Sequence, residues 1–362
     1  MKYKIDQSRR PVYLQIYEQI KDDIICENYP YGTKLPSKRL LADETETSTV
    51  TVEHAYALLC DEGYVEARER SGYFVIFRTS DGFALSSEAV ITRPSKIQGS
   101  GPSFPFSVLA KTMRGVISDL GEGILEKSES RGCPELRGAI RSYLAKNRGI
   151  SVDPDQIVIG SGAEYLYGLI IELLGRERIY GIENPSYEKI EQVYRAHKVR
   201  CEELPLSSDG IDGAALSESS ASILHTTPYR SYPTGVSASA SKRHEYIRWA
   251  SSGERYIIED DFESEFSVST KPEDTLFSLS DMENVIYLNT FSKTISPALR
   301  IGYMVLPKRL AREFEDRLGF YSCTVPTFEQ HVIARLINGG DFERHVNRVR
   351  RNKRKEISAS QK

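Results

Sequence analysis

The sequence predicts an α/β fold with a mostly parallel sheet, preceded by a small separate module. From residue 102 onward, short apolar runs alternate with helical patterns, the order expected when helices cover both faces of a parallel sheet. The apolar runs include IVIG, RIYGIE, SILHTT, YIIED and VIYLN. Residues 79–101 are polar, rich in Ser, Gly and Thr, and without periodicity, as linkers are. We therefore expect a module over residues 1–78, a linker over 79–101 and a large domain over 102–362.

Composition places few limits on function. The chain has 362 residues, a formal charge of -3 and a pI near 6.2, so its total charge does not indicate nucleic-acid binding. Its five cysteines are scattered, without the close pairs of metal sites or redox motifs, which favours reduced thiols and no metal. The start lacks the apolar stretch of a signal peptide, and the longest apolar run, residues 165–174, is too short to span a bilayer. We expect a cytoplasmic protein.

Residues 35–42 and the stretch from residue 48 predict two short helices joined by a tight turn. Ser37 is placed to cap the first helix, and Ser48 opens the second. Such a pair is typical of a helix-turn-helix, whose second helix would present Thr49, Thr51 and Glu53 to base edges. Four apolar residues of that helix are expected to pack inward: Val52, Ala55, Tyr56 and Leu59.

The module ends in a predicted hairpin, YVEARERSGYFVIF, with its turn at Ser71-Gly72. Arg68 and Arg70 could then contact phosphate as part of a wing. Residues 1–78 carry eleven Lys and Arg against thirteen Asp and Glu, so attraction to DNA would need a local patch or dimerisation. A small helical docking domain is the alternative interpretation.

The module resembles the winged helix of GntR-type bacterial regulators in four segments: PVYLQIYEQIKDDI, KLPSKRLLADE, TVEHAYALLCDEGYV and RSGYFV. The resemblance covers nearly all of it and implies binding to double-stranded DNA. It implies contacts from Ser37, Lys38, Arg39, Ser48, Thr49, Thr51, Arg68, Arg70 and Gly72. One departure is Thr49, where that family commonly carries an arginine.

In the large domain, residues 285–307 read VIYLNTFSKTISPALRIGYMVLP and place Lys293 between two apolar runs. The runs predict buried strands, so their connection is expected at a sheet edge, where ligand sites concentrate. Three hydroxyls in it can donate to phosphate oxygens, those of Thr290, Ser292 and Thr294. The guanidinium of Arg300 can bind two such oxygens at once. This pattern indicates a lysine held as an imine beside a bound phosphate.

Two further segments fit a ligand of this kind. IVIGSGAE predicts a strand, a turn and a helix start, so backbone N–H groups near Gly162 and Ala163 can face an anion. A plain glycine-containing turn is the alternative. Tyr187, in ENPSY after another short strand, offers a flat ring on which a planar ligand could stack, although such a tyrosine alone is more often a packing residue.

Residues 256–261, YIIEDD, predict a strand that ends in three carboxylates, a crowding of like charge that stability alone would not favour. Strand ends of this kind line the ligand crevice of α/β sheets, and a carboxylate there can keep a pyridine nitrogen protonated. A solvated acidic loop is the alternative. Combined with Lys293, Arg300 and the Gly162 turn, this segment indicates pyridoxal 5'-phosphate.

From about Gly121 the chain is similar to fold-type I aminotransferases, and more closely to the aminotransferase-like half of MocR-type regulators, which carry a GntR-like winged helix in front. The segments are RGCPELRGAIRSYLAKNRGI, TTPYRSYPTGV, RYIIEDDFESEF and NTFSKTISPALRIGYMVLP. The resemblance implies that Lys293 is the catalytic, Schiff-base residue, Asp260 the pyridinium partner and Tyr187 the stacking ring. It assigns the phosphate to Gly162, Ala163, Thr290, Ser292 and Arg300.

The chain departs from this family in several places. Phe262 stands where the family has a tyrosine, Tyr232 where aminotransferases place an asparagine, and Arg230-Ser231 where MocR-type proteins place His-Gln. After FERHVNRVRRNKRKEISASQK we expect the C-terminal subdomain to be missing, with the arginine that would bind a substrate carboxylate. Residues 341–362 carry eight Lys and Arg against three acids, either an exposed helix face or an additional DNA contact.

Three functions follow from these features. We favour a homodimeric transcriptional regulator that binds operator DNA and senses an amine, an amino acid or pyridoxal 5'-phosphate itself. A working aminotransferase is the second, and the missing carboxylate-binding arginine argues against it. The third is a shortened DNA-binding protein that no longer senses a ligand.

Overall fold

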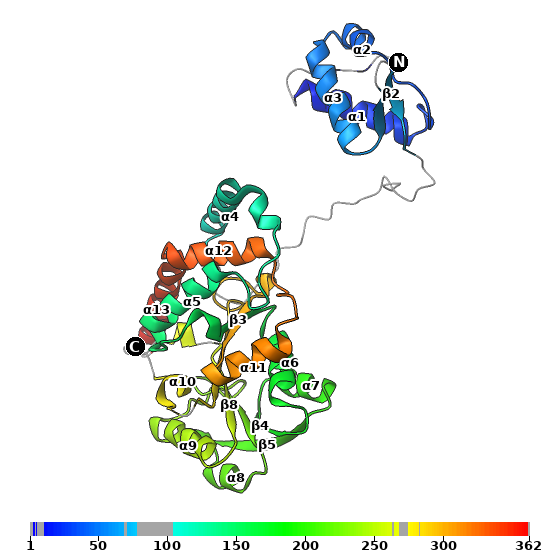
Figure 1. Cartoon of the computed structure of the whole chain (residues 1–362). Helices are drawn as coiled ribbons and strands as arrows, with labels where there is room; N and C mark the ends of the chain where they lie inside the picture. The colour runs from blue at the N-terminus through cyan, green and yellow to red at the C-terminus, as the bar shows by residue number, and fades with distance from the viewer. Residues whose placement is uncertain are drawn as a thin grey trace. The chain divides into compact units, whose positions relative to one another are not determined.

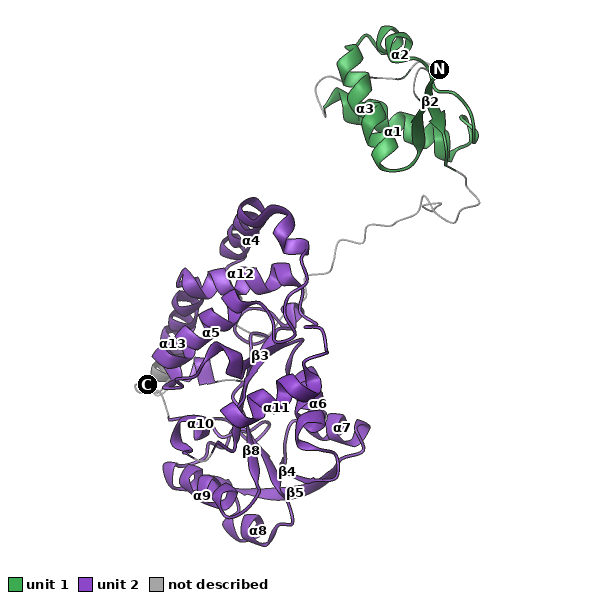
Figure 2. Cartoon of the chain, viewed as in Figure 1, with its two compact units in different colours: residues 1–97 green, residues 98–362 purple. Residues whose placement is uncertain are grey.

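The computed structural model describes residues 3, 5, 11–68, 71–77, 104–262, 264–267, 274–281 and 283–360. The chain divides into two compact units, Met1–Ile97 and Gln98–Lys362 (Figure 2). Arg70 and the predicted linker over 79–101 lie outside the described residues. Among the helices that are described, none has the length and apolar character needed to cross a membrane.

The smaller unit is a winged helix-turn-helix (Figure 1). It contains α1 (Val12–Ile25), α2 (Lys38–Thr45), α3 (Thr49–Asp61) and the antiparallel strands β1 (Val65–Arg68) and β2 (Gly72–Val75). The two predicted caps are confirmed. Ser37 Oγ accepts a hydrogen bond from the Leu40 amide at 3.2 Å, and Ser48 Oγ accepts one from the Thr51 amide at 3.1 Å.

The core of this unit forms between α1 and α3. All four α3 residues predicted to face inward, Val52, Ala55, Tyr56 and Leu59, are fully buried. They pack in one cluster with Ile16, Ile20 and Ile24 of α1 and with Val65 and Val75 of the two strands. The apolar face of α3 is thus used for packing, whereas Thr49 and Val50 at its start are exposed.

The larger unit is built on an eight-stranded sheet with the order β3-β10-β9-β8-β7-β4-β5-β6. Its strands are β3 (Ile157–Gly160), β4 (Ile179–Asn184), β5 (Arg200–Ser207), β6 (Gly210–Ile211), β7 (Ile223–Thr226), β8 (Tyr256–Asp260), β9 (Val285–Thr290) and β10 (Gly302–Val305). The neighbouring strands β9, β8, β7, β4 and β5 pair in parallel. Strand β10 is antiparallel to both β3 and β9. The prediction of a mostly parallel sheet is confirmed.

The lysine-bearing connection joins two interior strands, β9 and β10. It follows the carboxyl end of β9 and so lies at the edge of the sheet where the parallel strands end. The apolar pattern of a strand shows that the strand is buried, but it carries no information on the order of strands, which depends on pairing between distant segments.

Helices cover both faces of this sheet, because alternate residues of each strand point to opposite sides. On one face, Ile157 and Ile159 of β3 pack in a cluster that includes α5 and α12, and on the other face Val158 packs with residues of α6 and α11. The helices are α4 (Phe106–Leu120), α5 (Pro134–Arg148), α6 (Ala163–Leu174), α7 (Glu188–Ala196), α8 (Gly213–Glu218), α9 (Ala240–Ser251), α10 (Leu276–Leu279), α11 (Lys308–Leu318), α12 (Thr327–Asn338) and α13 (Asp341–Ser360).

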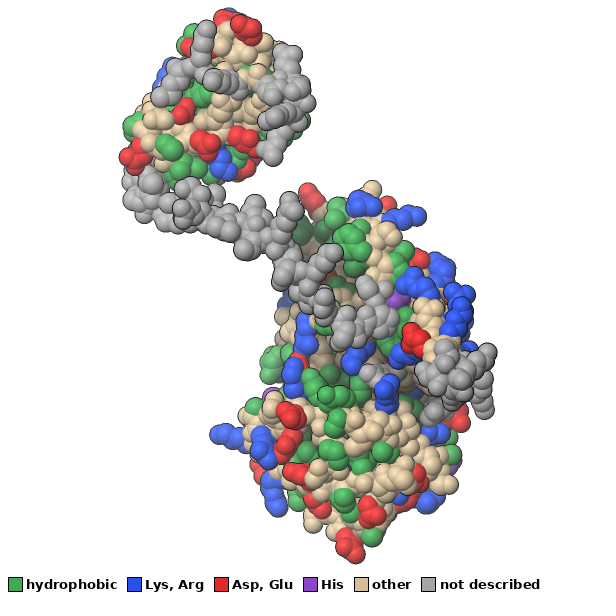
Figure 3. Space-filling model, turned by 180° about the vertical axis from the view of Figure 1, so that it is seen from behind, with side chains coloured by type: hydrophobic (Ala, Val, Ile, Leu, Met, Phe, Trp, Pro, Cys, Tyr) green, Lys and Arg blue, Asp and Glu red, His purple; other side chains and the backbone are tan. Residues whose placement is uncertain are grey.

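The basic segment near the end of the chain is the helix α13. Phe342, Val346 and Val349 are buried in the core of the larger unit, and Arg350 Nε donates to the carbonyl oxygen of Glu265 at 2.6 Å. Most of its other Lys and Arg side chains are exposed, and such side chains gather along this part of the unit in Figure 3. The helix is therefore a packed element with a solvated basic face.

Candidate functional site

A pocket of about 330 Å³ lies in the larger unit at the carboxyl ends of β8 and β9 and the start of α6. All the predicted cofactor residues except Gly162 line it. The lining residues are Ala163, Glu164, Tyr167, Tyr187, Ile190, Thr227, Tyr232, Asp260, Phe262, Thr290, Ser292, Lys293 and Arg300. The fold thus brings together segments from residue 163 to residue 300, because parallel strands end at the same side of the sheet.

Asp260 is the last residue of β8, and its carboxyl group is 4% exposed. One oxygen, Oδ2, accepts a hydrogen bond from the Tyr167 hydroxyl and lies 3.6 Å from His225 Nε2. The other oxygen, Oδ1, has no hydrogen-bond partner among the described residues. A buried carboxylate oxygen without a partner is costly, so a cationic donor in the pocket would satisfy it.

Tyr167 holds this carboxyl group by a hydrogen bond and His225 lies beside it, and the sequence interpretation missed both. Tyr167 lies on α6 and His225 on β7, and their rings contact each other edge to face at 4.9 Å. The other ring nitrogen of His225 lies 2.6 Å from the Tyr194 hydroxyl. An aromatic side chain in a helical pattern and a histidine in an apolar strand are ordinary core residues, so only their approach to Asp260 reveals their role.

The neighbours of Asp260 are also buried, which rules out the alternative of a solvated acidic loop. Glu259 accepts hydrogen bonds from the Leu276 amide at 2.8 Å and the Tyr229 hydroxyl at 2.5 Å. Asp261 pairs with Arg148 at 2.6 Å. Strand alternation turns Asp260 to the opposite face of the sheet from its two neighbours, so each carboxyl group has its own partners.

The predicted phosphate side of the pocket lies at the start of α6. Gly162 caps this helix with a φ of +96°, and a Cβ at that position would lie 3.0 Å from the guanidinium of Arg300. Arg300 itself adopts a φ of +48°. A glycine is needed here, because its left-handed backbone lets the guanidinium approach the amide end of the helix.

Glu164 also occupies this end of the pocket, which the sequence interpretation did not foresee. Its carboxylate accepts hydrogen bonds from Arg300 and, at 2.8 Å, from Lys189 Nζ. These pairs with Lys189 and Arg300 lower the pKa of Glu164. A phosphate bound to Arg300 and the α6 amides would have to share the guanidinium with this carboxylate.

Lys293 and two aromatic residues form the rest of the pocket. Lys293 Nζ lies 5.6 Å from the centre of the Phe262 ring. Tyr187 is 42% exposed and meets Tyr232 edge to face with ring centres 6.0 Å apart. Thr294 is buried and does not line the pocket, so of the three hydroxyls only those of Thr290 and Ser292 do so.

In the smaller unit, most of the predicted DNA contacts lie at the starts of α2 and α3. Arg39 and Thr49 are exposed, whereas Lys38 pairs with Glu53 at 2.7 Å. Val50 is 71% exposed and adjoins them, an apolar side chain that the sequence interpretation passed over. An exposed β-branched residue in the first turn of a recognition helix can contact the methyl group of a thymine.

The predicted wing also forms. Gly72 follows the turn with a φ of +107°, and Arg68 lies on the preceding strand with its guanidinium 4.6 Å from the Phe74 ring centre. Arg68 also pairs with Glu66 at 3.1 Å. The Phe74 ring and the Glu66 carboxylate hold the guanidinium against the hairpin. To contact DNA, Arg68 would release Glu66 and bind phosphate oxygens in its place.

Comparison with known proteins matches both units to families. Residues 12–75 match the gntR family of bacterial regulatory proteins, and residues 101–359 match the class I and II aminotransferases. The uncharacterized HTH-type transcriptional regulator YdeL of Bacillus subtilis is 32% identical over 95% of this chain and 77% of its own length. The probable rhizopine catabolism regulatory protein MocR of Rhizobium meliloti is 26% identical over 94% of this chain and 74% of its own length.

Among solved structures, the larger unit is similar to the kynurenine aminotransferase of Pyrococcus horikoshii, solved in complex with PMP. The TM-score is 0.64 at 26% identity, covering 75% of this chain and 74% of that one. Pyridoxal 5'-phosphate is the cofactor that this aminotransferase fold implies. The pocket fits it, with a lysine, a buried carboxylate lacking one partner and an arginine at a helix start. The chain belongs to the MocR-type transcriptional regulators of the GntR superfamily, in which a winged helix precedes an aminotransferase-like domain.

Proposed function

We propose that this regulator binds pyridoxal 5'-phosphate covalently through Lys293 and that the bound group senses a small amine, an amino acid or the free cofactor. One observation carries the proposal: the unpartnered Oδ1 of Asp260 and the amino group of Lys293 line the same pocket. When bound, the cofactor supplies an aldehyde that condenses with amines and a ring that accepts electron density.

Each predicted cofactor-binding residue then has a proposed role. Asp260 keeps a proton on the ring nitrogen, because its Oδ1 can accept a hydrogen bond while the Tyr167 hydroxyl donates to its Oδ2. Arg300 and the amides at Gly162 and Ala163 hold the phosphate. The hydroxyls of Thr290 and Ser292 donate to the same anion, and the ring of Tyr187 covers one face of the cofactor.

The phenylalanine at position 262 favours ligand sensing over catalytic turnover of a substrate. Its ring cannot donate a hydrogen bond to the phenolic oxygen of the cofactor, and it places an apolar surface near Lys293 Nζ. A regulator needs only that ligand binding changes the relative stability of two states of the protein. We propose that such a change alters how the winged helices of a homodimer meet two operator half-sites.

DNA recognition is proposed to use residues at the starts of α2 and α3 and in the wing. Thr49, Thr51 and Ser48 lie in or before the first turn of α3, the part of a recognition helix that reaches base edges. Ser37, Lys38 and Arg39 begin α2 and would contact the backbone, as would Arg68 and the amide of Gly72 in the wing.

The cofactor part is tested with the full chain and the Lys293→Ala variant. We expect the wild-type protein to be yellow and to retain the cofactor after borohydride reduction and denaturation, whereas Lys293→Ala retains none. Lys146→Ala is the control, because Lys146 pairs with Glu343 on the surface and does not line the pocket. Asp260→Asn should weaken cofactor binding about tenfold or more, since a hydrogen bond to a charged group is lost. An unchanged spectrum in Lys293→Ala would refute covalent attachment.

The regulatory part is tested on operator DNA selected from a random oligonucleotide pool by the full chain. We expect a panel of amines and amino acids, or free cofactor, to change the affinity for that DNA in wild-type protein and not in Lys293→Ala. Failure to retard any DNA at low salt would refute the proposed DNA-binding role. Repeated turnover of an amino acid with a keto acid would instead favour the aminotransferase.

A further inference from the structure

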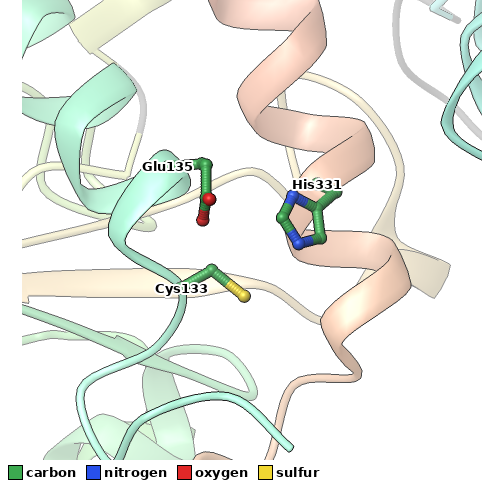
Figure 4. A group of neighbouring side chains, drawn as sticks. All are labelled: Cys133, Glu135 and His331. Atoms are coloured by element: carbon green, nitrogen blue, oxygen red, sulfur yellow. The ribbon is translucent and has the colours of Figure 1, made fainter. Parts of the chain in front are cut away.

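Three side chains with metal-binding donors meet between the start of α5 and the middle of α12, and none of them lines the cofactor pocket (Figure 4). They are Cys133, Glu135 and His331. The sulfur atom, a carboxylate oxygen and a ring nitrogen all lie within 4.8 Å of one another. We propose that Cys133, Glu135 and His331 bind one Zn²⁺ ion, with water completing the coordination.

The kinds of donor favour zinc over other abundant cations. Thiolate and imidazole ligands suit Zn²⁺, whereas Mg²⁺ and Ca²⁺ prefer oxygen ligands throughout. A thiolate and a carboxylate together also neutralise the charge of a divalent ion. Donors around a tetrahedral zinc ion are roughly 3.2 to 3.8 Å apart, as bond lengths of about 2.0 to 2.3 Å require. Because Glu135 is exposed and His331 half-buried, small side-chain rotations can close the remaining distance.

The backbone around the three residues is fixed by a buried amide. Gln330, next to His331 on α12, is fully buried. Its Oε1 accepts a hydrogen bond from the Cys133 amide at 2.7 Å, and its Nε2 donates to the Val325 carbonyl at 2.8 Å and to Ser128 Oγ at 3.1 Å. The start of α5 is therefore tied to α12 one residue away from the histidine, which preorganises the site.

Helix capping does not explain Cys133. It occupies the N-cap position of α5, and its side chain makes no capping hydrogen bond. Elsewhere in the larger unit, the N-cap residues Asp212, Ser239 and Thr275 each accept a hydrogen bond from the backbone of their helix. A thiol is a poor cap because sulfur is a weak acceptor, so capping of α5 does not occupy the Cys133 sulfur.

A zinc ion at this site would link two segments that lie almost two hundred residues apart in the sequence. Helices α5 and α12 pack against each other in the core on one face of the sheet. An ion bound to both stabilises the folded larger unit, because its ligands are not held together in the unfolded chain. The proposal does not depend on the cofactor, since the proposed zinc site and the cofactor pocket share no residue.

The test uses the full, untagged chain with its cofactor in place. The protein is stripped of metal by a chelator, and Zn²⁺ is then titrated in competition with a chromophoric chelator. Elemental analysis gives the stoichiometry. We expect one zinc per chain, a higher melting temperature with zinc, and an affinity reduced about tenfold or more in Cys133→Ser, Glu135→Gln and His331→Gln.

Cys323→Ser is the matched control. Cys323 lies beside the site, where Gln330 Nε2 approaches its sulfur at 3.5 Å, but its thiol is directed at the carbonyl oxygens of Ile159 and Val325. We expect its zinc affinity to equal that of the wild type. Glu135→Gln keeps the test valid if Cys133→Ser folds poorly, because Glu135 is exposed. Absence of stoichiometric zinc in the wild type, or equal losses in Cys323→Ser, would overturn the assignment.

Discussion

At the residue scale, the end of β8 shows how neighbouring carboxyl groups acquire different chemistry. Asp260 faces the cofactor pocket with one oxygen unpartnered among the described residues, and Asp261 is neutralised by Arg148. Among the described residues, the hydrogen bonds to Glu259 come from a tyrosine and two backbone amides, none of which is cationic. Burial raises the pKa of Glu259 from 4.5 to about 7, although these hydrogen bonds act in the opposite direction.

This raised pKa predicts the sign of a pH effect on stability. Between pH 4.5 and 7 the folded chain keeps a proton on Glu259 that the unfolded chain has released, so stability falls as the pH rises. The contribution is fully present below pH 4.5 and amounts to about 3 kcal/mol at most. In Glu259→Gln, the part of the fall in unfolding free energy with rising pH that Glu259 causes should disappear. Denaturant unfolding measured between pH 4.5 and 8 checks this.

A residual slope is expected in that variant, because burial also raises the pKa of Glu265 to about 7. Glu254→Gln is the control, since Glu254 is exposed just before the same strand. If Glu259→Gln and Glu254→Gln had the same pH profile as the wild type, the buried position of Glu259 would not govern stability.

At the scale of elements, α3 combines a buried face with an exposed first turn. Ser48 caps the helix, Val52 and Tyr56 anchor it in the core, and Thr49 and Val50 remain exposed. The helix start also directs free backbone N–H groups outward, which favours phosphate. The unit carries no excess positive charge, so each added cation at this end should have a measurable effect on DNA binding.

Replacing Thr49 by arginine tests whether an added cation at the start of α3 strengthens DNA binding. We expect Thr49→Arg to bind operator DNA more tightly and to steepen the slope of log affinity against log salt by about one unit, as one extra phosphate contact would. Ser142→Arg, which adds the same charge on an exposed position of α5, should leave the slope unchanged. A slope that responds equally to both substitutions would mean that only total charge matters, and that α3 does not face the DNA.

At the scale of the whole molecule, α4 exposes apolar side chains that a second copy of the chain could cover. Phe106 is 78% exposed, Ile117 51% and Leu120 37%, although the opposite side of the helix packs on the core. Exposed apolar patches of this kind commonly mark interfaces. Because a helix-turn-helix protein binds paired half-sites as a symmetric dimer, we propose that α4 contributes to the dimer contact.

In light scattering we therefore expect the wild type to be dimeric and the Ile117→Glu variant to be monomeric. We expect the wild type to bind an inverted repeat at least about tenfold more tightly than one half-site, through the second contact, and the variant to lose that advantage. Ile76→Glu places the same change on an apolar side chain of the smaller unit that is 36% exposed, and should keep the dimer. A dimeric Ile117→Glu would exclude α4 from the interface.

Local sequence was sufficient for several elements of this protein. Ser37 and Ser48 marked two helix starts, and the alternation of apolar runs with helical patterns indicated the parallel sheet. Caps, turns and periodicity depend on residues a few positions apart, so the chain displays them directly. The lysine loop, the acidic strand end and the glycine turn were visible for the same reason, because each places its functional side chain within a short segment.

Tertiary structure decided which distant residues meet. Tyr167 and His225 reach Asp260, Glu164 competes for Arg300, and β9 and β10 become interior strands only when segments far apart in the chain pack together. The same holds for Cys133 and His331, whose spacing indicated no metal site. The sequence alone therefore determined the two domain types and the cofactor chemistry, whereas the partners of each functional group depended on long-range packing, which local spacing does not encode.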